Sequence, residues 1–135
     1  MKKNLGFTLI ELLVVVAIIG VLTTLILANL FDARARARDA VKKSDFGELK
    51  TALRMYYNDY QAYPAIQSVI TGATFTPYMK KVPIYAFTYV SPDASHETFF
   101  LKVTLENASD SDLLTSQTRC SGSGAAITEY VVCED

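Results

Sequence analysis

The sequence predicts an α+β fold in which one long N-terminal α-helix packs on a small antiparallel β-sheet. No proline occurs between Met1 and Tyr63, so nothing in that stretch forbids a continuous helix. From Phe46 to Tyr60, apolar residues recur at alternating intervals of three and four residues, which is typical of a helix with one buried face. The rest of the chain contains three short segments rich in aromatic and β-branched residues, which predict strands. A chain of 135 residues fits one small domain behind its apolar N-terminus.

A short basic leader and a long apolar run form the N-terminus. Lys2 and Lys3 precede Gly6, and the twenty residues from Leu12 to Phe31 carry no charge. A run of about 20 apolar residues is long enough to cross a bilayer as a helix, and the basic leader marks its cytoplasmic end. In a secretory signal the small residue at the cleavage site follows the apolar region, whereas here Gly6 precedes it. Cleavage after Gly6 would therefore leave the spanning segment on the mature chain.

The most specific motif of the chain is Gly6-Phe7-Thr8-Leu9-Ile10-Glu11-Leu12. Followed directly by a spanning segment, it resembles the class III signal of type IV pilins and of the related type II secretion pseudopilins. The resemblance implies that a prepilin peptidase cleaves between Gly6 and Phe7 and methylates the new amino group of Phe7. It is close over residues 1–60 and concerns only the general layout beyond them.

The resemblance also implies the pilin fold and a division of the chain into three parts. We expect a leader peptide at 1–6, a hydrophobic transmembrane and polymerisation helix at 7–31, and an amphipathic helix with a globular β-sheet head at 32–135. A helix from Phe7 to Tyr60 would be about 80 Å long at 1.5 Å per residue. One small head cannot cover that length. We therefore expect the N-terminal half to be buried by the membrane before assembly and by copies of itself in a filament.

Glu11 is the one carboxylate of the apolar stretch, and an acid at membrane depth costs about 2.5–3.5 kcal/mol on insertion scales. Cleavage would expose the α-amine of Phe7, and pairing the two opposite charges would offset much of their desolvation. Following the resemblance, we expect an assembly salt bridge between Glu11 and Phe7 of neighbouring subunits. A pair within one helix and a proton-relay acid are the alternatives. Gly20 is expected to weaken the helix, against the alternative that membrane helices simply tolerate glycine.

The head is predicted from its strand and turn patterns. Tyr63-Pro64 ends the long helix, and a short helix is expected at 65–70. Strands are expected at 84–90, 97–106 and 127–133. The second strand should turn inward Phe99, Leu101, Val103 and Leu105, and outward Thr98, Lys102 and Thr104. The sheet should pack on the core stripe of the helix, which consists of Phe46, Leu49, Leu53, Tyr56 and Tyr60.

Cys120 and Cys133 are the two cysteines of the chain, and both lie near its C-terminus. A pair without neighbouring Cys or His ligands is a poor zinc site, because zinc takes four ligands. A disulfide suits an extracytoplasmic domain, and closing a loop of this length stabilises by about 3 kcal/mol in the chain-entropy model. Two free buried thiols are the alternative.

Charge is distributed unevenly along a chain whose net charge is −1. Residues 32–60 hold seven basic and five acidic side chains, whereas residues 61–135 hold four basic and eight acidic ones. The basic run consists of Arg34, Arg36, Arg38, Lys42 and Lys43, and Asp39 interrupts it. DNA binding would need such a patch exposed and unopposed. We expect instead a face that meets solvent, lipid headgroups or neighbouring subunits, so nucleic acid is not an expected partner.

Few residues suggest other chemistry. Glu106, Asn107, Asp110 and Asp112 could supply oxygens to calcium, as in some pseudopilins, but their spacing matches no calcium motif and an acidic surface loop is expected. His96, the single histidine, is expected in a turn. No nucleophile–base pair, nucleotide-binding loop or metal-ligand cluster is recognisable. We therefore expect no enzymatic activity, no cofactor and no metal.

The sequence thus predicts a structural subunit of a type IV pilus-like filament, serving adhesion, motility or surface attachment. The resemblance implies as partners further copies of the chain, a prepilin peptidase, an inner-membrane assembly platform and a motor ATPase. The precursor would cross the inner membrane once, and the filament would lie outside the cell. The alternatives are a major pseudopilin of a type II secretion system, a competence-type pilin for DNA uptake, and a single-pass membrane protein that never polymerises.

Overall fold

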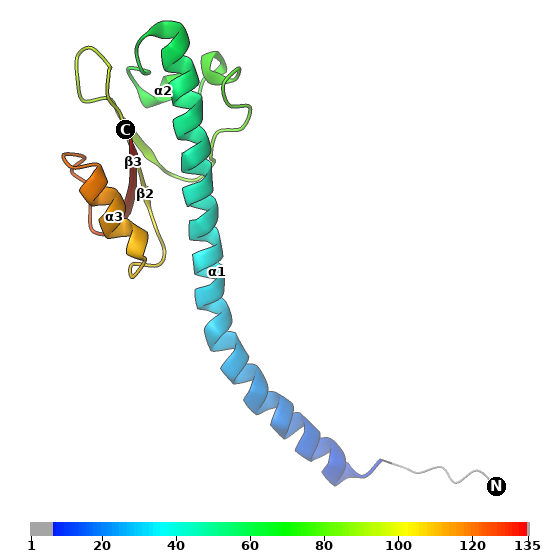
Figure 1. Ribbon diagram of the computed structural model, residues 1–135. Coiled ribbons are helices and arrows are strands. Elements are labelled where there is room, and N and C mark those ends of the chain that lie inside the picture. Colours follow the sequence, from blue (N-terminus) through cyan, green and yellow to red (C-terminus); the bar gives the residue numbers. More distant parts are fainter. Residues whose placement is uncertain (1–6, 135) are drawn as a thin grey trace. The chain divides into compact units, whose positions relative to one another are not determined.

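The computed structural model describes residues 7–134, so Lys2, Lys3 and Gly6 lie outside the described residues. The first element is α1, a helix of 52 residues that spans Leu9–Tyr60. The elements after it are α2 (Gln67–Ile70), the 3-10 helix η1 (Ala73–Phe75), β1 (Thr88–Val90), β2 (Phe100–Thr104), α3 (Ser111–Arg119) and β3 (Glu129–Cys133) (Figure 1). The chain forms two compact units, Met1–Ala35 and Arg36–Asp135. The fold class is α+β, as predicted.

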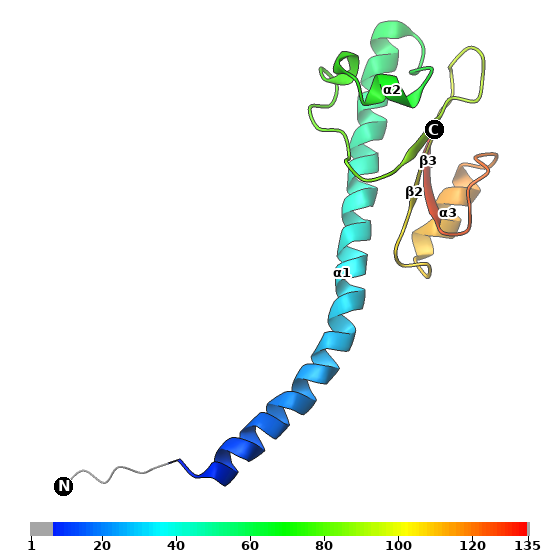
Figure 2. The same ribbon diagram turned by 180° about the vertical axis from the view of Figure 1, so that it is seen from behind.

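The sheet of the second unit has three strands in the order β1-β2-β3, and both pairs are antiparallel. Thr88 lies opposite Lys102, and Phe100 lies opposite Cys133. Because β2 is the central strand, its alternate side chains form the floor of the core. The inward residues are buried as predicted, namely Phe99, Leu101, Val103 and Leu105. α3 follows β2 and lies beside β3 (Figures 1 and 2).

The C-terminal part of α1 supplies the other half of this core. Phe46, Leu49 and Leu53 are fully buried, and Tyr56 is partly buried against the same cluster. The core stripe is therefore confirmed over three turns. The prediction is wrong for its last member, because Tyr60 is 58% exposed and stacks on Tyr56 with ring centroids 4.4 Å apart. α1 ends at Tyr60, and the next residue already leaves the helix with a positive φ of 56°.

All three strands are shorter than predicted, and the first loses most of its length. The sequence predicts a strand over 84–90, but β1 begins at Thr88. The Tyr85 hydroxyl instead bonds to α1, donating to the Lys42 carbonyl at 3.3 Å and lying 3.2 Å from the Asp45 carboxylate. The register of β1 would place residue 86 opposite Thr104. The carbonyl of Thr104 accepts a hydrogen bond from the Lys42 ammonium at 3.1 Å. The Lys42 side chain thus binds an oxygen at the position where a longer β1 would continue its pairing with β2.

The helix α3 was not predicted, because this stretch was expected to be an acidic loop. Asp110 caps it, accepting a hydrogen bond from the backbone N–H of Asp112 at 2.9 Å. Leu113 and Ser116 are its buried residues, and Arg119 lies in its last turn. The capping residue and the C-terminal arginine are both sequence signals of a helix. The short helix expected at 65–70 is present as α2.

Candidate functional site

The N-terminus of α1 is closed by a reciprocal pair of side chains. The Glu11 carboxylate accepts from the Thr8 backbone N–H at 2.9 Å and from the Thr8 hydroxyl at 2.7 Å. The Thr8 hydroxyl in turn accepts from the Glu11 backbone N–H at 3.3 Å. This is a capping box, which satisfies two backbone donors that a helix start leaves open. Thr8-x-x-Glu11 is the sequence signature of that box, although it was not among the predicted features.

The capping box gives Glu11 a partner within its own chain. Before cleavage the nitrogen of Phe7 belongs to the peptide bond that follows Gly6, so no α-amine is present to pair with Glu11. Phe7 itself is 75% exposed. The salt bridge between Glu11 and the freed amine of Phe7 therefore stays a prediction about the cleaved chain, and so do cleavage and methylation.

The segment after the box exposes a continuous set of apolar side chains. α1 contains a stretch long and apolar enough to cross a membrane, and none of that stretch is buried within the chain. The hydroxyls of Thr23 and Thr24 donate to the helix carbonyls of Ile19 and Val21. Polar groups that form their hydrogen bonds within the helix are compatible with lipid, because no water is present there to bond to them. α1 is continuous through Gly20, and the weakening predicted there stays a prediction.

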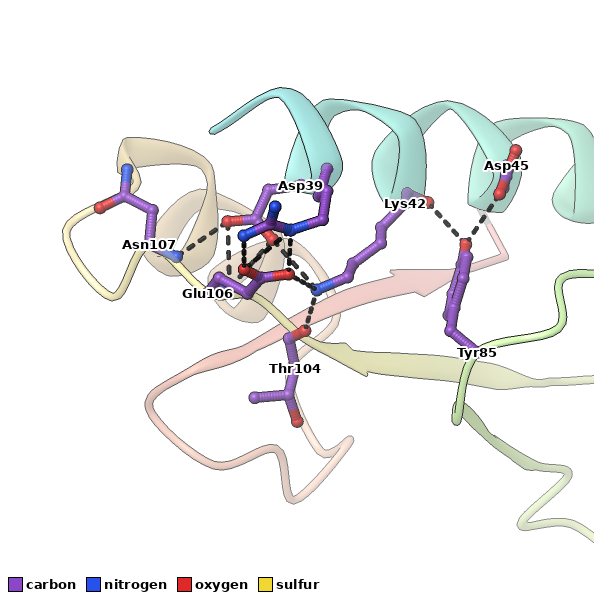
Figure 3. A network of polar contacts seen from close by, with 8 residues as sticks. Asp39, Lys42, Asp45, Tyr85, Thr104, Glu106 and Asn107 are labelled. Atoms are coloured by element: carbon purple, nitrogen blue, oxygen red, sulfur yellow. Dashed lines mark hydrogen bonds and ion pairs between the residues drawn. The ribbon is translucent and has the colours of Figure 1, made fainter. Parts of the chain in front are cut away.

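Asp39 is the least expected feature of the head. Its side chain is 1% exposed, although in the sequence it only interrupts the basic run. The carboxylate accepts from the backbone N–H of Glu106 at 2.9 and 3.0 Å and from that of Asn107 at 2.8 Å (Figure 3). Burial alone would raise the pKa of Asp39. The two backbone donors and then Lys42 outweigh burial and hold the pKa below its ordinary value.

Lys42 and Glu106 lie beside this buried carboxylate (Figure 3), and Arg38 binds Glu106 in turn. Lys42 lies 3.2 Å from Asp39 and 3.4 Å from Glu106. Arg38 binds Glu106 through its Nε, at 2.9 and 3.0 Å from the two carboxylate oxygens. The hydrogen bonds from Arg38 lower the pKa of Glu106. This Asp39 network, formed by Arg38, Asp39, Lys42, Glu106 and Asn107, joins α1 to the end of β2.

Lys43 makes the second connection between α1 and the C-terminal part of the head. Its ammonium lies 2.6 Å from Asp110 and 2.7 Å from Asp112, and it also lies over the Tyr130 ring at 5.7 Å. Hydrogen bonding to Lys43 lowers the pKa of Asp110. The carboxylates considered for calcium therefore bind basic side chains. Among residues 7–134 no group of three or more His, Cys, Asp or Glu side chains is arranged to hold a metal ion.

A disulfide closes the C-terminal segment. It joins Cys120, at the end of α3, to Cys133, the last residue of β3, with the Cα atoms 5.7 Å apart. Cys120, Cys133 and the buried Val131 form a small apolar cluster of their own. The sequence led us to expect this bridge but not the helix, and the bridge ties α3 to the edge strand. His96 has a positive φ of 54° in the turn before β2, where it was also expected.

Comparison with known proteins finds a family motif and several relatives of the chain. The family model described as "Prokaryotic N-terminal methylation motif" matches residues 1–27. Type II secretion system core protein G of Pseudomonas aeruginosa is 32% identical over 96 residues, which are 62% of this chain and 68% of that protein. The chain belongs to the family of type IV pilins and type II secretion pseudopilins.

Relatives of this pilin-family chain carry both kinds of name. Type II secretion system core protein G of Escherichia coli is 35% identical, over 60% of this chain and 65% of that protein. Type IV wide pilus major component PilA4 of Thermus thermophilus is 39% identical, over 57% of this chain and 60% of that protein. The chain spans less than two thirds of the length of several relatives. For type II secretion system core protein G of Klebsiella pneumoniae, for example, the share is 62%. Comparison with solved structures gives no match.

Proposed function

We propose that the chain is a structural subunit of a type IV pilus-like filament. One observation carries the proposal. The methylation motif covers residues 1–27, and from Leu9 onward the same segment is a helix whose apolar side chains are exposed. An exposed apolar surface of this extent needs lipid or other protein around it. Storage in the membrane followed by packing in a filament meets that need in turn.

In this proposal a prepilin peptidase cleaves between Gly6 and Phe7 and methylates Phe7. The chain then consists of the helix 7–31 and the head 32–135, without the leader 1–6. The precursor crosses the inner membrane once, and an assembly platform driven by a motor ATPase adds it to a surface filament. On recruitment the freed amine of Phe7 replaces or joins Thr8 as the partner of Glu11.

The test is electron microscopy of filaments sheared from cells, with the intact mass of their subunit. We expect filaments of a chain that begins at Phe7 and carries one methyl group. A subunit that retains residues 1–6 would contradict the cleavage. If the cells make no filaments whose formation requires this gene, the proposal itself is contradicted.

Two variants separate the charge of Glu11 from its capping role. Glu11→Gln keeps the capping box, because glutamine can occupy the same position of the box. It removes the charge, so we expect normal insertion and few or no filaments. Glu11→Ala removes both and should also insert readily. Normal filaments from Glu11→Gln cells would leave capping as the role of this residue and exclude the salt bridge with Phe7.

The second candidate function is that of a major pseudopilin in a type II secretion system. It is supported by the several relatives named type II secretion system core protein G. Deleting the gene distinguishes the two functions. Loss of surface filaments with intact protein secretion supports a pilin, and the reverse supports a pseudopilin. Uptake of DNA is less favoured, because Arg38, Lys42 and Lys43 of the basic run are bound to acidic side chains of the head.

A further inference from the structure

Two grooves of opposite charge flank α1 in the head. The acidic groove lies between α1 and the chain before β1, and the charged residues that line it are Asp45, Glu48 and Lys81. The basic groove lies between α1, the end of α3 and β3, and the charged residues that line it are Lys43, Lys50 and Arg119. Of these, Lys43 is already bound to Asp110 and Asp112. The chain before β1 and α3 lie on opposite sides of α1 in both views of the ribbon (Figures 1 and 2). Glu48 on one flank and Arg119 on the other are therefore opposite charges that can pair between copies.

The basic groove contains a glycine that the fold itself does not require. Gly47 lies inside α1, where glycine costs stability relative to alanine. A Cβ atom built on Gly47 would meet nothing within 4 Å. No neighbour in the described chain therefore excludes a side chain at this position. A glycine of this kind suits the close approach of another molecule to the helix backbone.

The acidic groove carries an apolar side chain that is almost fully exposed in the described part of the chain. Ile84 lines this groove and is 94% exposed, and its neighbour Val41 on α1 is 57% exposed. A fully exposed isoleucine beside a second exposed apolar residue is a small apolar knob. The basic groove encloses about 180 Å³. A cavity of about 150 Å³ holds a benzene molecule, so this space is sufficient for one aliphatic side chain.

We propose that the acidic groove of one copy docks on the basic groove of the next copy. Ile84 then lies over Gly47 of the neighbour, and Glu48 lies beside its Arg119. Glu48 is exposed, and neither it nor Arg119 forms a salt bridge within the described residues. Because the two surfaces are different, the contact is head-to-tail and propagates into an open series of subunits rather than closing as a dimer. The inference rests on the proposed filament function and names the head contact that accompanies helix packing.

Cysteine cross-linking tests the contact in assembled filaments. The full chain carrying Gly47→Cys together with Ile84→Cys is expressed in cells, and the sheared filaments are oxidised with copper phenanthroline. We expect a ladder of covalent oligomers on non-reducing gels. Each single variant is the matched control and should remain monomeric, because a head-to-tail contact brings unlike positions together. Filaments of the double variant without a ladder would overturn the proposal, and so would equal dimerisation of a single variant.

A second experiment separates assembly from folding. Gly47→Leu should keep or raise the melting temperature of the full chain in detergent, because the side chain meets no neighbour and leucine favours helix. It should lower filament yield by about tenfold or more, which corresponds to about 1.4 kcal/mol. The control is Ser44→Leu, an exposed position of α1 that lines neither groove. Normal filaments from Gly47→Leu would contradict the docking.

Charge exchange gives a third readout. Glu48→Arg and Arg119→Glu should each reduce filament yield, and the combination should restore it, because the pair is rebuilt with reversed signs. Absence of rescue would contradict the proposed partner of Glu48. If the unaltered chain forms no filaments at all, the proposed function fails. If it does and these variants behave like the unaltered chain, only the docking fails.

Discussion

Removing the Asp39 carboxylate should destabilise the head more than any exposed substitution on the same helix. In Asp39→Ala the backbone N–H groups of Glu106 and Asn107 lose their acceptor at a site that is 1% exposed. Lys42 loses one partner but retains the Thr104 carbonyl and Glu106. The cost is therefore that of two buried donors without an acceptor.

Each such donor costs about 1–3 kcal/mol, so the expected loss in the free energy of unfolding is about 2–6 kcal/mol. That is a large share of the about 5–15 kcal/mol by which folded domains are stable. Asp39→Asn keeps one oxygen that both backbone donors can reach, but it places an NH₂ group against the Glu106 N–H and the Lys42 ammonium. Its loss should lie between that of the alanine variant and zero.

The assay is urea unfolding of the full chain in detergent, followed by near-ultraviolet circular dichroism. All eight tyrosines lie between residues 56 and 130, so the tyrosine signal reports the head alone. The control is Asp32→Ala, which removes an exposed acid from α1 and should change stability by no more than about 0.5 kcal/mol. Equal small losses for the two alanine variants would refute the reasoning and mean that Asp39 contributes nothing to the link between α1 and β2.

Acid should reveal the same carboxylate. The pKa of Asp39 is lower in the folded head than the ordinary value of about 3.9. Its contribution to stability is therefore fully present above that value and is lost as the pH falls through the folded-state pKa. Glu106 and Asp110 have lowered pKa values and act in the same direction. Asp39→Asn should make the acid side of the stability curve shallower, and an unchanged slope would contradict the assignment.

Three further predictions concern processing, the bridge and the core. Gly6→Val should block cleavage before Phe7, since the peptidase implied by the family accepts a small residue, and intact mass should show the leader retained. Cys133→Ser should lower the stability of the head by about 3 kcal/mol because it opens the loop, and non-reducing peptide mapping should find the bridge in the unaltered chain. Leu53→Ala should cost about 2–5 kcal/mol because Leu53 is fully buried, whereas the exposed Thr104→Ala should cost about 0.5 kcal/mol or less in the same urea assay.

Each of these predictions has an outcome that contradicts it. Normal processing of Gly6→Val would place the cleavage site elsewhere. Two alkylatable thiols in freshly sheared filaments would exclude the bridge between Cys120 and Cys133. Losses that are equal and small for Leu53→Ala and Thr104→Ala would mean that the core stripe does not support the sheet.

The elements that the sequence predicted well are those governed by local pattern and apolar burial. The spacing of Phe46, Leu49 and Leu53 predicts a buried helix face, and the alternation around Leu101 predicts the inward face of β2. Both predictions hold because the side chains of a regular helix or strand return to the same apolar surface at a fixed interval along the sequence. The predictions for Tyr60 and for the first half of the strand over 84–90 are wrong because these residues lie where an element ends. There, tertiary hydrogen bonds such as those of the Tyr85 hydroxyl decide the path of the chain.

Asp39 could not be found by the same reasoning, although it obeys the same period. It lies seven residues before Phe46, two turns back on the buried side of α1, so the core-facing side of the helix extends beyond its apolar residues. An aspartate is mostly exposed unless it is paired, and a reading by hydropathy therefore ends the stripe too early. Its pairing depends on the backbone N–H groups of Glu106 and Asn107, 67 and 68 residues further along the chain. Only the fold brings those donors to it. The helical period thus gives the side of α1 on which Asp39 lies, whereas its burial and its partners follow only from the tertiary structure.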